Sequence, residues 1–365
     1  MWDVAIIGAG LTGITCARQL RAGGYRVCVL DKSRGVGGRL STRRVNDHTR
    51  VDHGLPYWSP KTSALKALTD ELLSAGVLRQ WPVSAYEIRQ RESLTPVETD
   101  ALYVATEGMS AIAKYLAQDL IADRALLTDH KAVGIRSSEG RWEITCEGVE
   151  GEGGKVIQAQ RCVIAIPAPQ AVDLLEPFAG DESSRQPISA AIAQLRAVDY
   201  HPCLSVLAGY SSGDLKDTEM LSPNGWMVSD RVGTSTAWIG LDSSKRDSSA
   251  GSEDTPVVVI HSKADFARQY IDAGDLQPAA SVLLRANARK LGDWIAEPKW
   301  LQIHRWRYAQ VNIAHPEAAL AVGETLVCGG DWCKGPDAET AAENIDMAYL
   351  SGSAIAQRIQ TQPST

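Results

Sequence analysis

The sequence lacks any apolar run of the roughly 18 residues that a membrane-spanning helix needs, so we expect no membrane span. Its seven cysteines include no C-x-x-C pair and its seven histidines show no metal-ligand spacing, so we expect no metal site. Cys16, Cys28, Cys162 and Cys328 lie in apolar contexts, which predicts buried thiols in a reducing, cytoplasmic compartment. Because Met1 lies directly against the first predicted strand, we expect no signal peptide.

Positive charge is scarce as well. The chain has 37 Lys and Arg against 44 Asp and Glu, and the net charge of −7 disfavours nucleic acid or an anionic membrane as a partner. Phenylalanine occurs only twice, against ten tryptophans and ten tyrosines, so most aromatic rings carry a polar group. With 365 residues, 44% of them apolar, the chain can form one large or two interleaved domains around a sizeable core.

What the sequence does contain is a dinucleotide-binding pattern at its start. Residues 3–7 form an apolar strand that runs into Gly8, Gly10 and Gly13. The first glycine allows a tight turn, the second lets backbone N–H groups approach a pyrophosphate, and the third lets a helix pack close to the strand. Asp31 follows the next strand, where an acid would bind a ribose diol. The alternative is a chance glycine turn in a structural βαβ unit.

A second glycine motif, Gly37-Gly38-Arg39, follows the strand at 26–30. It resembles the doublet of the flavin amine oxidase superfamily, in which the small residues pass close to the FAD pyrophosphate and the arginine helps to hold it. An arginine suits a site beside two phosphates, because its guanidinium can donate two parallel hydrogen bonds to phosphate oxygens. The alternative is that Arg39 and Arg43 lie in a solvated loop.

The chain returns to the cofactor near its end, where the apolar strand 325–328 precedes Gly329-Gly330-Asp331. Since both ends require the same FAD, we predict a discontinuous nucleotide domain. The fold class is α/β: a Rossmann-type (glutathione-reductase-like) FAD-binding domain interleaved with an α+β substrate domain on a mixed or antiparallel sheet. The FAD-binding domain takes residues 1–60, 101–166 and 319–365, and the substrate domain takes 61–100 and 167–318. We also expect helices at 61–76 and 341–359, a hairpin tip at 148–154 and an exposed linker at 180–188.

Further motifs, in matching order, resemble the renalase branch of the flavin amine oxidase superfamily. They are the turn 51–58, the helix-opening segment 104–110, the histidine strand 258–262, the Trp-Arg strand 304–311 and the cofactor strand 327–331. The resemblance implies non-covalent FAD, although Cys333 leaves a covalent link open. The predicted cofactor contacts are Gly8, Gly10, Leu11, Thr12, Gly13, Asp31, Lys32, Gly38, Arg39, Leu40, His53, Gly54, Leu55, Val133, Gly330, Asp331, Ile345, Asp346 and Ala348.

Two departures from the superfamily pattern bear on the chemistry. Met347 stands where amine oxidases have a glycine near the flavin pyrimidine, which affects the fit at that edge of the ring. The stretch 200–204 lacks the lysine that amine oxidases carry on a strand of the substrate domain, which weakens an amine-oxidation reading.

The resemblance implies that the substrates are isomeric reduced nicotinamide dinucleotides, the 2- and 6-dihydro forms of NAD(P). They would be oxidised to NAD(P)+ by hydride transfer to flavin N5, with O2 reduced to hydrogen peroxide. His261, Trp306 and Tyr57 are the predicted catalytic residues. The histidine would bond a carboxamide or a group beside the flavin, and the two aromatic rings would form an apolar slot. Each of the three could instead serve core packing. Hydride transfer itself requires no acid–base pair or nucleophile from the protein.

Several alternatives stay open. Arg305, Arg307 and Lys245 are candidates for holding substrate phosphates, and segment 242–245 either lines the pocket mouth or is a solvated loop. The protein could instead be a flavin amine oxidase or a desaturase of a small apolar substrate. A third possibility is a flavin-holding interaction protein with little turnover. We expect a monomer or a weak dimer.

Overall fold

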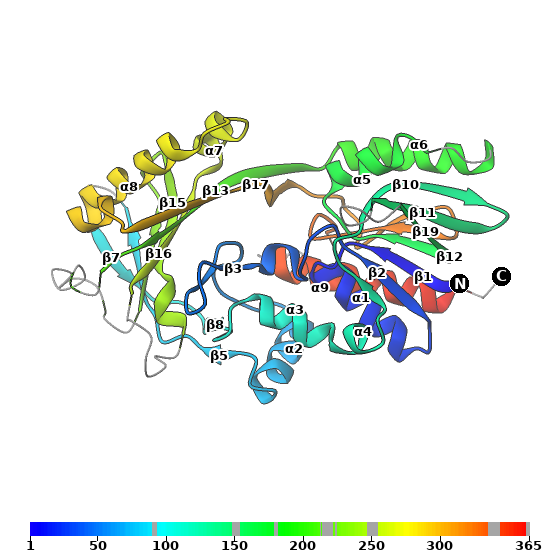
Figure 1. Cartoon of the computed structure of the whole chain (residues 1–365), viewed down its shortest axis with the longest axis horizontal. Coiled ribbons are helices and arrows are strands. Elements are labelled where there is room, and N and C mark those ends of the chain that lie inside the picture. Colours follow the sequence, from blue (N-terminus) through cyan, green and yellow to red (C-terminus); the bar gives the residue numbers. More distant parts are fainter. Residues whose placement is uncertain are drawn as a thin grey trace.

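The structure is a computed structural model. It describes residues 1–89, 93–147, 154–178, 182–211, 213, 222, 225–246, 255–334 and 344–362, and of 182–185 only the backbone. Two large β-sheets lie at opposite ends of an elongated molecule (Figure 1). Among the helices of the described part, none has the length and apolarity that a bilayer crossing needs. The hairpin tip expected at 148–154 falls, except for Gly154, outside the described residues.

The first sheet carries the glycine-rich start of the chain. Its central strand β1 (Trp2–Ile7) is parallel to β2 (Val27–Leu30) on one side and to β12 (Lys155–Ile164) on the other. The late strand β19 (Leu326–Cys328) joins β12 in parallel, so the last motif of the chain lies two strands from the first. The sheet is completed by β9 (Leu126–Leu127), β10 (Lys131–Ser138), β11 (Arg141–Glu147) and β18 (Leu320–Val322).

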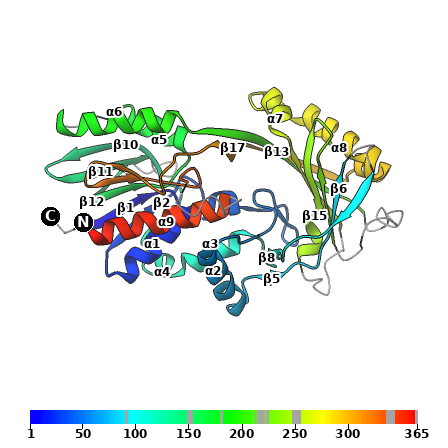
Figure 2. The same ribbon diagram turned by 180° about the vertical axis from the view of Figure 1, so that it is seen from behind.

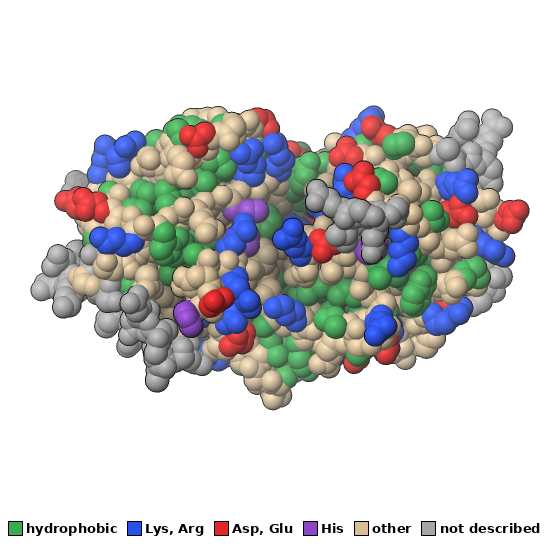
Figure 3. Space-filling view, in the orientation of Figure 1, with side chains coloured by type: hydrophobic (Ala, Val, Ile, Leu, Met, Phe, Trp, Pro, Cys, Tyr) green, Lys and Arg blue, Asp and Glu red, His purple; other side chains and the backbone are tan. Residues whose placement is uncertain are grey.

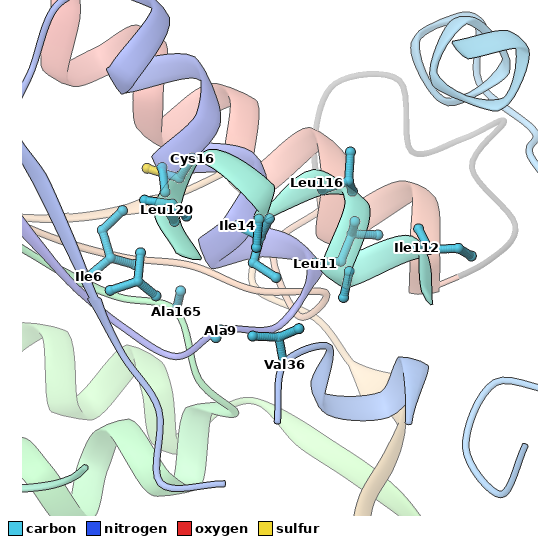
Figure 4. Packing of buried hydrophobic residues seen from close by; sticks show 14 of the residues in the cluster. Ile6, Ala9, Leu11, Ile14, Cys16, Val36, Ile112, Leu116, Leu120 and Ala165 are labelled. Carbon is cyan, nitrogen blue, oxygen red and sulfur yellow. The ribbon is translucent and has the colours of Figure 1, made fainter. Parts of the chain in front are cut away.

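Helices from both ends of the chain cover one face of this sheet. α1 (Leu11–Ala22) and α9 (Asn344–Thr361) run side by side, as the view from behind shows (Figure 2). They approach closely because Gly352 lies at the contact, where a Cβ would come within 2.5 Å of the carbonyl oxygen of Thr12. Ile6 of β1, Ile14 of α1 and Leu116 of α3 (Ser110–Leu116) belong to one buried cluster between the sheet and the helices (Figure 4). This close packing fixes the start of α1 against the sheet.

Three helices that the sequence assigns to the substrate domain pack instead on the first sheet. α2 (Ser63–Ser74), the expected helix at 61–76, buries its leucines in the same core as α1. α5 (Ala168–Leu175) and α6 (Glu182–Arg196) share a core with β2 and β12. The expected linker at 180–188 is therefore wrong from residue 182 onward. An amphipathic pattern predicts a buried helix face but does not specify which sheet covers it.

The second sheet is mixed, as predicted. Its order is β17 (Trp300–Ile313), β13 (Asp199–Gly209), β16 (Val257–Ser262), β15 (Thr236–Leu241), β14 (Trp226–Asp230), β6 (Ser84–Ile88) and β7 (Leu94–Val97). Neighbouring strands are antiparallel except β14 and β6. α7 (Ala264–Tyr270) and α8 (Gln277–Leu291) pack on its outer face. Long strands β13 and β17 reach across to the first lobe (Figure 1).

Candidate active site

A cavity of about 2310 Å³ lies between the two sheets and takes its lining from both. It exceeds the roughly 300–1,000 Å³ of an ordinary ligand pocket, so it has room for a dinucleotide and a second ligand. Twelve Lys and Arg residues line it against four Asp, although the whole chain has more acids than bases. Figure 3 shows the surface hollowed between the lobes, with basic and histidine side chains around the hollow. The cavity therefore favours anionic ligands.

The turn between β1 and α1 builds one end of the cavity. Gly8 has a φ of +109°, and a Cβ there would lie 2.4 Å from the carbonyl oxygen of Ala165. A Cβ at Gly10 would meet nothing within 4 Å and would project into free space. Leu11 and Thr12, the first residues of α1, also line the cavity, where the unpaired N–H groups of a helix start favour an anion. These features fit a bound pyrophosphate.

Asp31 lies at the end of β2, on the cavity wall. Its Oδ2 accepts a hydrogen bond from the backbone N–H of Ala9 (2.7 Å), and its Oδ1 accepts one from Ser33 (2.8 Å). The carboxylate is thus fixed beside the glycine turn. Each carboxylate oxygen can accept a further bond, so the group fits a ribose diol.

Arg39 has protein partners that the sequence did not predict. Its guanidinium makes a two-point ion pair with Asp331, at 2.5 and 2.6 Å, and also donates to the carbonyl oxygens of Tyr308 and Ala309. Burial alone would lower the pKa of Arg39, but the Asp331 carboxylate raises it overall. The residue therefore ties the second glycine motif to the Gly-Gly-Asp motif and to β17, and because it also lines the cavity, its contact with a pyrophosphate stays a prediction.

Most other predicted cofactor residues also line the cavity. These are Lys32, Gly38, Leu40, His53, Gly54, Leu55, Val133, Gly330, Ile345 and Ala348. Two do not. Gly13 faces the strand, where a Cβ would come within 1.9 Å of the carbonyl oxygen of Gly8. Asp346 is buried and accepts hydrogen bonds from the N–H and hydroxyl of Thr62, both at 2.8 Å, so it joins α9 to α2.

Aromatic rings and histidines form the other end of the cavity. The indole N–H of Trp306 donates to the carbonyl oxygen of His53 (2.8 Å), and the two rings stack with centroids 5.4 Å apart. His304 approaches both rings edge-on, at 4.8 Å from His53 and 4.5 Å from Trp306. His261 lies opposite Ser205 of β13, which pairs with His304 on its other side. The structure thus brings the predicted His261 and Trp306 to one wall.

Tyr57 reaches the cavity from the other lobe. Its ring centroid lies 6.4 Å from that of Trp238, which in turn lies 5.4 Å from His261. All three predicted catalytic residues line the cavity. His304 also lines the cavity, although its motif predicted no role for it beyond the start of the Trp-Arg strand. Its position two residues before Trp306 on the same strand face is the signal that could have identified it.

The three histidines are neutral near pH 7. Burial lowers the pKa of His53 to about 3, and the charges of His304 and Arg43 add to the effect. Burial, followed by the charge of Lys245, lowers the pKa of His261 to about 4. Burial also lowers the pKa of His304 to about 4. Neutral imidazoles can donate and accept hydrogen bonds but do not bring a fixed charge to this end of the cavity.

Behind this wall lies a buried ion cluster that sequence reasoning missed. Lys245 Nζ lies 2.6 Å from Asp242 and 3.7 Å from Asp52, while Arg246 lies 2.9 Å from Asp52. Both carboxylates and the lysine are fully buried. Asp52 also accepts from the backbone N–H of Met109 (2.9 Å), which connects the cluster to the start of α3. Segment 242–245 is therefore neither a pocket mouth nor a solvated loop.

The cations expected at the rim are engaged elsewhere. Arg305 donates to the carbonyl oxygens of Ile271 and Ala273, at 3.0 and 2.9 Å, and Arg307 pairs with Asp272. Lys245 belongs to the buried cluster. None of the three is therefore free to hold a substrate phosphate, so that expectation is corrected.

A Rossmann-type nucleotide fold facing a second sheet across one cavity defines a flavin-dependent oxidoreductase. The family described as "Flavin containing amine oxidoreductase" matches residues 81–360, and the "NAD(P)-binding Rossmann-like domain" matches residues 6–72. The first of these matches covers well over half of the chain. The chain belongs to the flavin-containing amine oxidoreductase family, and its cofactor is FAD. The predicted fold class and cofactor are thereby confirmed.

Individual relatives agree with the family. Putrescine oxidase of Kocuria rosea is 41% identical over 70 residues, which are 19% of this chain and 14% of that protein. Flavin-containing amine oxidase A of Sus scrofa is 38% identical over 72 residues, 20% of this chain and 14% of that protein. These alignments thus span about a seventh of each relative.

Solved structures show the same fold over the whole chain. A putrescine oxidase bound to putrescine gives a TM-score of 0.72 at 14% identity and covers 99% of both chains. Cyclohexylamine oxidase from Brevibacterium oxydans gives 0.65 at 14% identity, covering 98% of this chain and 99% of that one. At this level of identity the likeness establishes the fold and leaves the substrate to the residues of the cavity.

Proposed function

We propose that this flavoprotein oxidises isomeric reduced nicotinamide dinucleotides, the 2- and 6-dihydro forms of NAD(P). The excess of cations around the cavity, twelve Lys and Arg against four Asp, carries the proposal. These substrates bear phosphates, which such a cavity attracts. Amines are cations near neutral pH, and three of the four acids that line the cavity already have partners. Asp331 pairs with Arg39, Asp265 with Arg268, and Asp31 accepts from two backbone N–H groups.

When bound, FAD supplies an acceptor for a hydride and returns the electrons to O2. Loss of one hydride from the dihydropyridine ring leaves NAD(P)+, and two electrons with two protons convert O2 into hydrogen peroxide. The protein's share is to bind, orient and exclude water. Trp306, fixed by its bond to His53, gives a flat wall, and Tyr57 lines the same cavity beside Trp238. Neutral His261 can hydrogen-bond the carboxamide of the substrate without placing a positive charge beside the nicotinamide ring.

Oxidation of an amine is the second candidate, and family membership favours it. The relatives described above are named as putrescine and amine oxidases. The stretch 200–204, where the sequence lacks the lysine typical of amine oxidases, forms the start of β13 beside Trp306. The cationic lining and this missing lysine together make the amine reading the weaker one.

A donor screen under anaerobic conditions distinguishes these functions. We expect the 2- and 6-dihydro isomers of NAD(P) to bleach the yellow protein rapidly, air to restore the colour with formation of hydrogen peroxide, and putrescine or benzylamine to act poorly. Rapid bleaching by an amine with no response to the isomers would overturn the proposal. Failure of every donor would favour the flavin-holding interaction protein.

We also propose a cytoplasmic location. The support is that all seven cysteines are free and six of them are buried, which suits a reducing compartment. Cys333 is among the buried thiols, and burial raises its pKa to about 12. A protonated thiol is a poor nucleophile, so this supports non-covalent FAD. Acid precipitation tests that point, because the colour should stay in the supernatant. The expected monomer or weak dimer stays a prediction.

A further inference from the structure

Five cations that line the cavity, Lys32, Arg43, Arg44, Lys114 and Lys263, have no side-chain partner among the residues that the structure describes, and two of them lie on opposite walls. Arg43 belongs to β3 (Thr42–Arg44) of the first lobe, and Lys263 follows β16 of the second sheet. Neither makes an ion pair or side-chain hydrogen bond within the described part of the chain. By contrast, Arg231, Arg268 and Arg307 on the same lining each pair with an acid.

Both cations lie beside the aromatic end of the cavity. Arg43 lies opposite Val51 in the pair of β3 with β4 (Arg50–Asp52), and His53 follows β4 directly, so Arg43 and His53 are neighbours on the cavity wall. Lys263 comes two residues after His261, between β16 and α7, and lines the same cavity as His261. The main chain of Lys263 is fixed there because its N–H donates to the carbonyl oxygen of Ser235 (2.7 Å). One cation from each wall thus lies near a histidine at the aromatic end of the cavity, Lys263 along the chain and Arg43 across the β3–β4 pair.

We infer that Arg43 and Lys263 form a subsite for the pyrophosphate of a nicotinamide dinucleotide whose ring lies against Trp306. This inference rests on the proposed function and deepens it. Arginine offers a two-point fork to phosphate oxygens, and lysine acts as a compact point charge. A dinucleotide held this way points its nicotinamide toward the neutral histidines and its phosphates toward the rim. The subsite would select dinucleotides over free dihydronicotinamides.

Binding to the oxidised, FAD-loaded protein tests the subsite without turnover. NAD+ and free nicotinamide are titrated while the flavin absorbance is followed, for the wild type and for Arg43→Gln and Lys263→Gln. We expect each substitution to weaken NAD+ binding roughly tenfold, the scale of one lost charge-assisted contact, and to leave nicotinamide binding unchanged. Inorganic pyrophosphate should compete with NAD+ in the wild type. Arg289→Gln, an exposed cation on α8 away from the cavity, controls for net charge.

Three outcomes would overturn the inference: no binding of NAD+ to the wild type, unchanged NAD+ affinity in both variants, or an equal loss of affinity for NAD+ and nicotinamide. Failure of the proposed function is distinguishable from these. If the dihydro isomers bleach the flavin while both variants bind NAD+ normally, only the subsite fails. If no isomer is oxidised but NAD+ binding still depends on both cations, the subsite stands as an anion site and the proposed oxidation fails.

Discussion

The buried ion cluster makes the sharpest test of how this fold is held together. Lys245, Asp242, Asp52 and Arg246 bring two positive and two negative charges together, with no exposure of the first three. Lys245→Met removes one positive charge and leaves two buried carboxylates facing one guanidinium. Breaking a buried pair in this way costs about 3–5 kcal/mol, because the remaining charge is left uncompensated away from water.

The double variant Asp242→Asn with Lys245→Met should lose much less free energy of unfolding than the sum of the two single changes. It removes one charge of each sign and keeps the 2.9 Å pair of Asp52 with Arg246, so the cluster stays neutral. We expect Asp242→Asn alone to be strongly destabilising, because it leaves an excess positive charge. The coupling between the two sites should reach about 1–3 kcal/mol, at the upper end for residues in direct contact.

Urea unfolding, followed by far-UV circular dichroism, measures these changes. A loss of about 3–5 kcal/mol should lower the midpoint by about 1 M or more, given slopes of about 3 kcal/mol per M. Glu71→Gln is the matched control, because it breaks the Arg18–Glu71 pair, whose side chains are 43% and 36% exposed. An exposed pair contributes about 0.2–1 kcal/mol. The reasoning is refuted if Lys245→Met resembles this control or if the single losses simply add in the double variant.

Two further predictions follow from the nucleotide turn and from the histidines. Gly10→Val should purify colourless and melt like the FAD-free wild type, because its side chain enters open cavity space and blocks the cofactor without straining the fold. Gly13→Ala should melt below the FAD-free wild type because its Cβ meets the carbonyl oxygen of Gly8. A fully yellow Gly10→Val protein would contradict this. The pKa is lowered to about 3 for His53 and to about 4 for His304, from about 6.5 in the unfolded chain. The contribution of these two residues to stability is therefore present above pH 6.5 and is lost as the pH falls toward 4. Melting temperatures should therefore fall between pH 7 and 5, and His53→Gln should reduce that slope; an equally steep slope in the variant would count against the assignment.

The nucleotide half of the fold could be read from the sequence because its signals are local. The strand before Gly8, the glycine spacing and the acid at Asp31 all lie within one βαβ unit. The tight turn and the close packing of helix on strand that these residues require involve only residues near them in the chain. The assignment of α2, α5 and α6 failed for the opposite reason. An apolar stripe indicates that one face of a helix is buried. The sheet against which that face packs depends on contacts with residues far away in the sequence.

Charged residues show the same limit most clearly. Arg39 was predicted only as a contact for a pyrophosphate, and its ion pair with Asp331, 292 residues away, was not foreseen. Lys245 stands in a serine-rich stretch typical of a solvated loop, yet it is buried beside Asp52. An ion pair depends on which segments the fold brings together, and a local pattern contains at most one of the two partners.

Net charge misleads in the same way at the scale of the whole molecule. A chain with a charge of −7 reads as a poor binder of anions, but its cavity is lined by twelve basic residues and four acids. Other acids of the described part pair with cations on the outer surface, as Asp123 does with Arg21 and Glu176 with Arg196, and water and salt screen such charges from the cavity. For an enzyme of this shape, the sign of the substrate therefore follows from the charges that the fold gathers between its two sheets, and the composition of the chain carries little information about it.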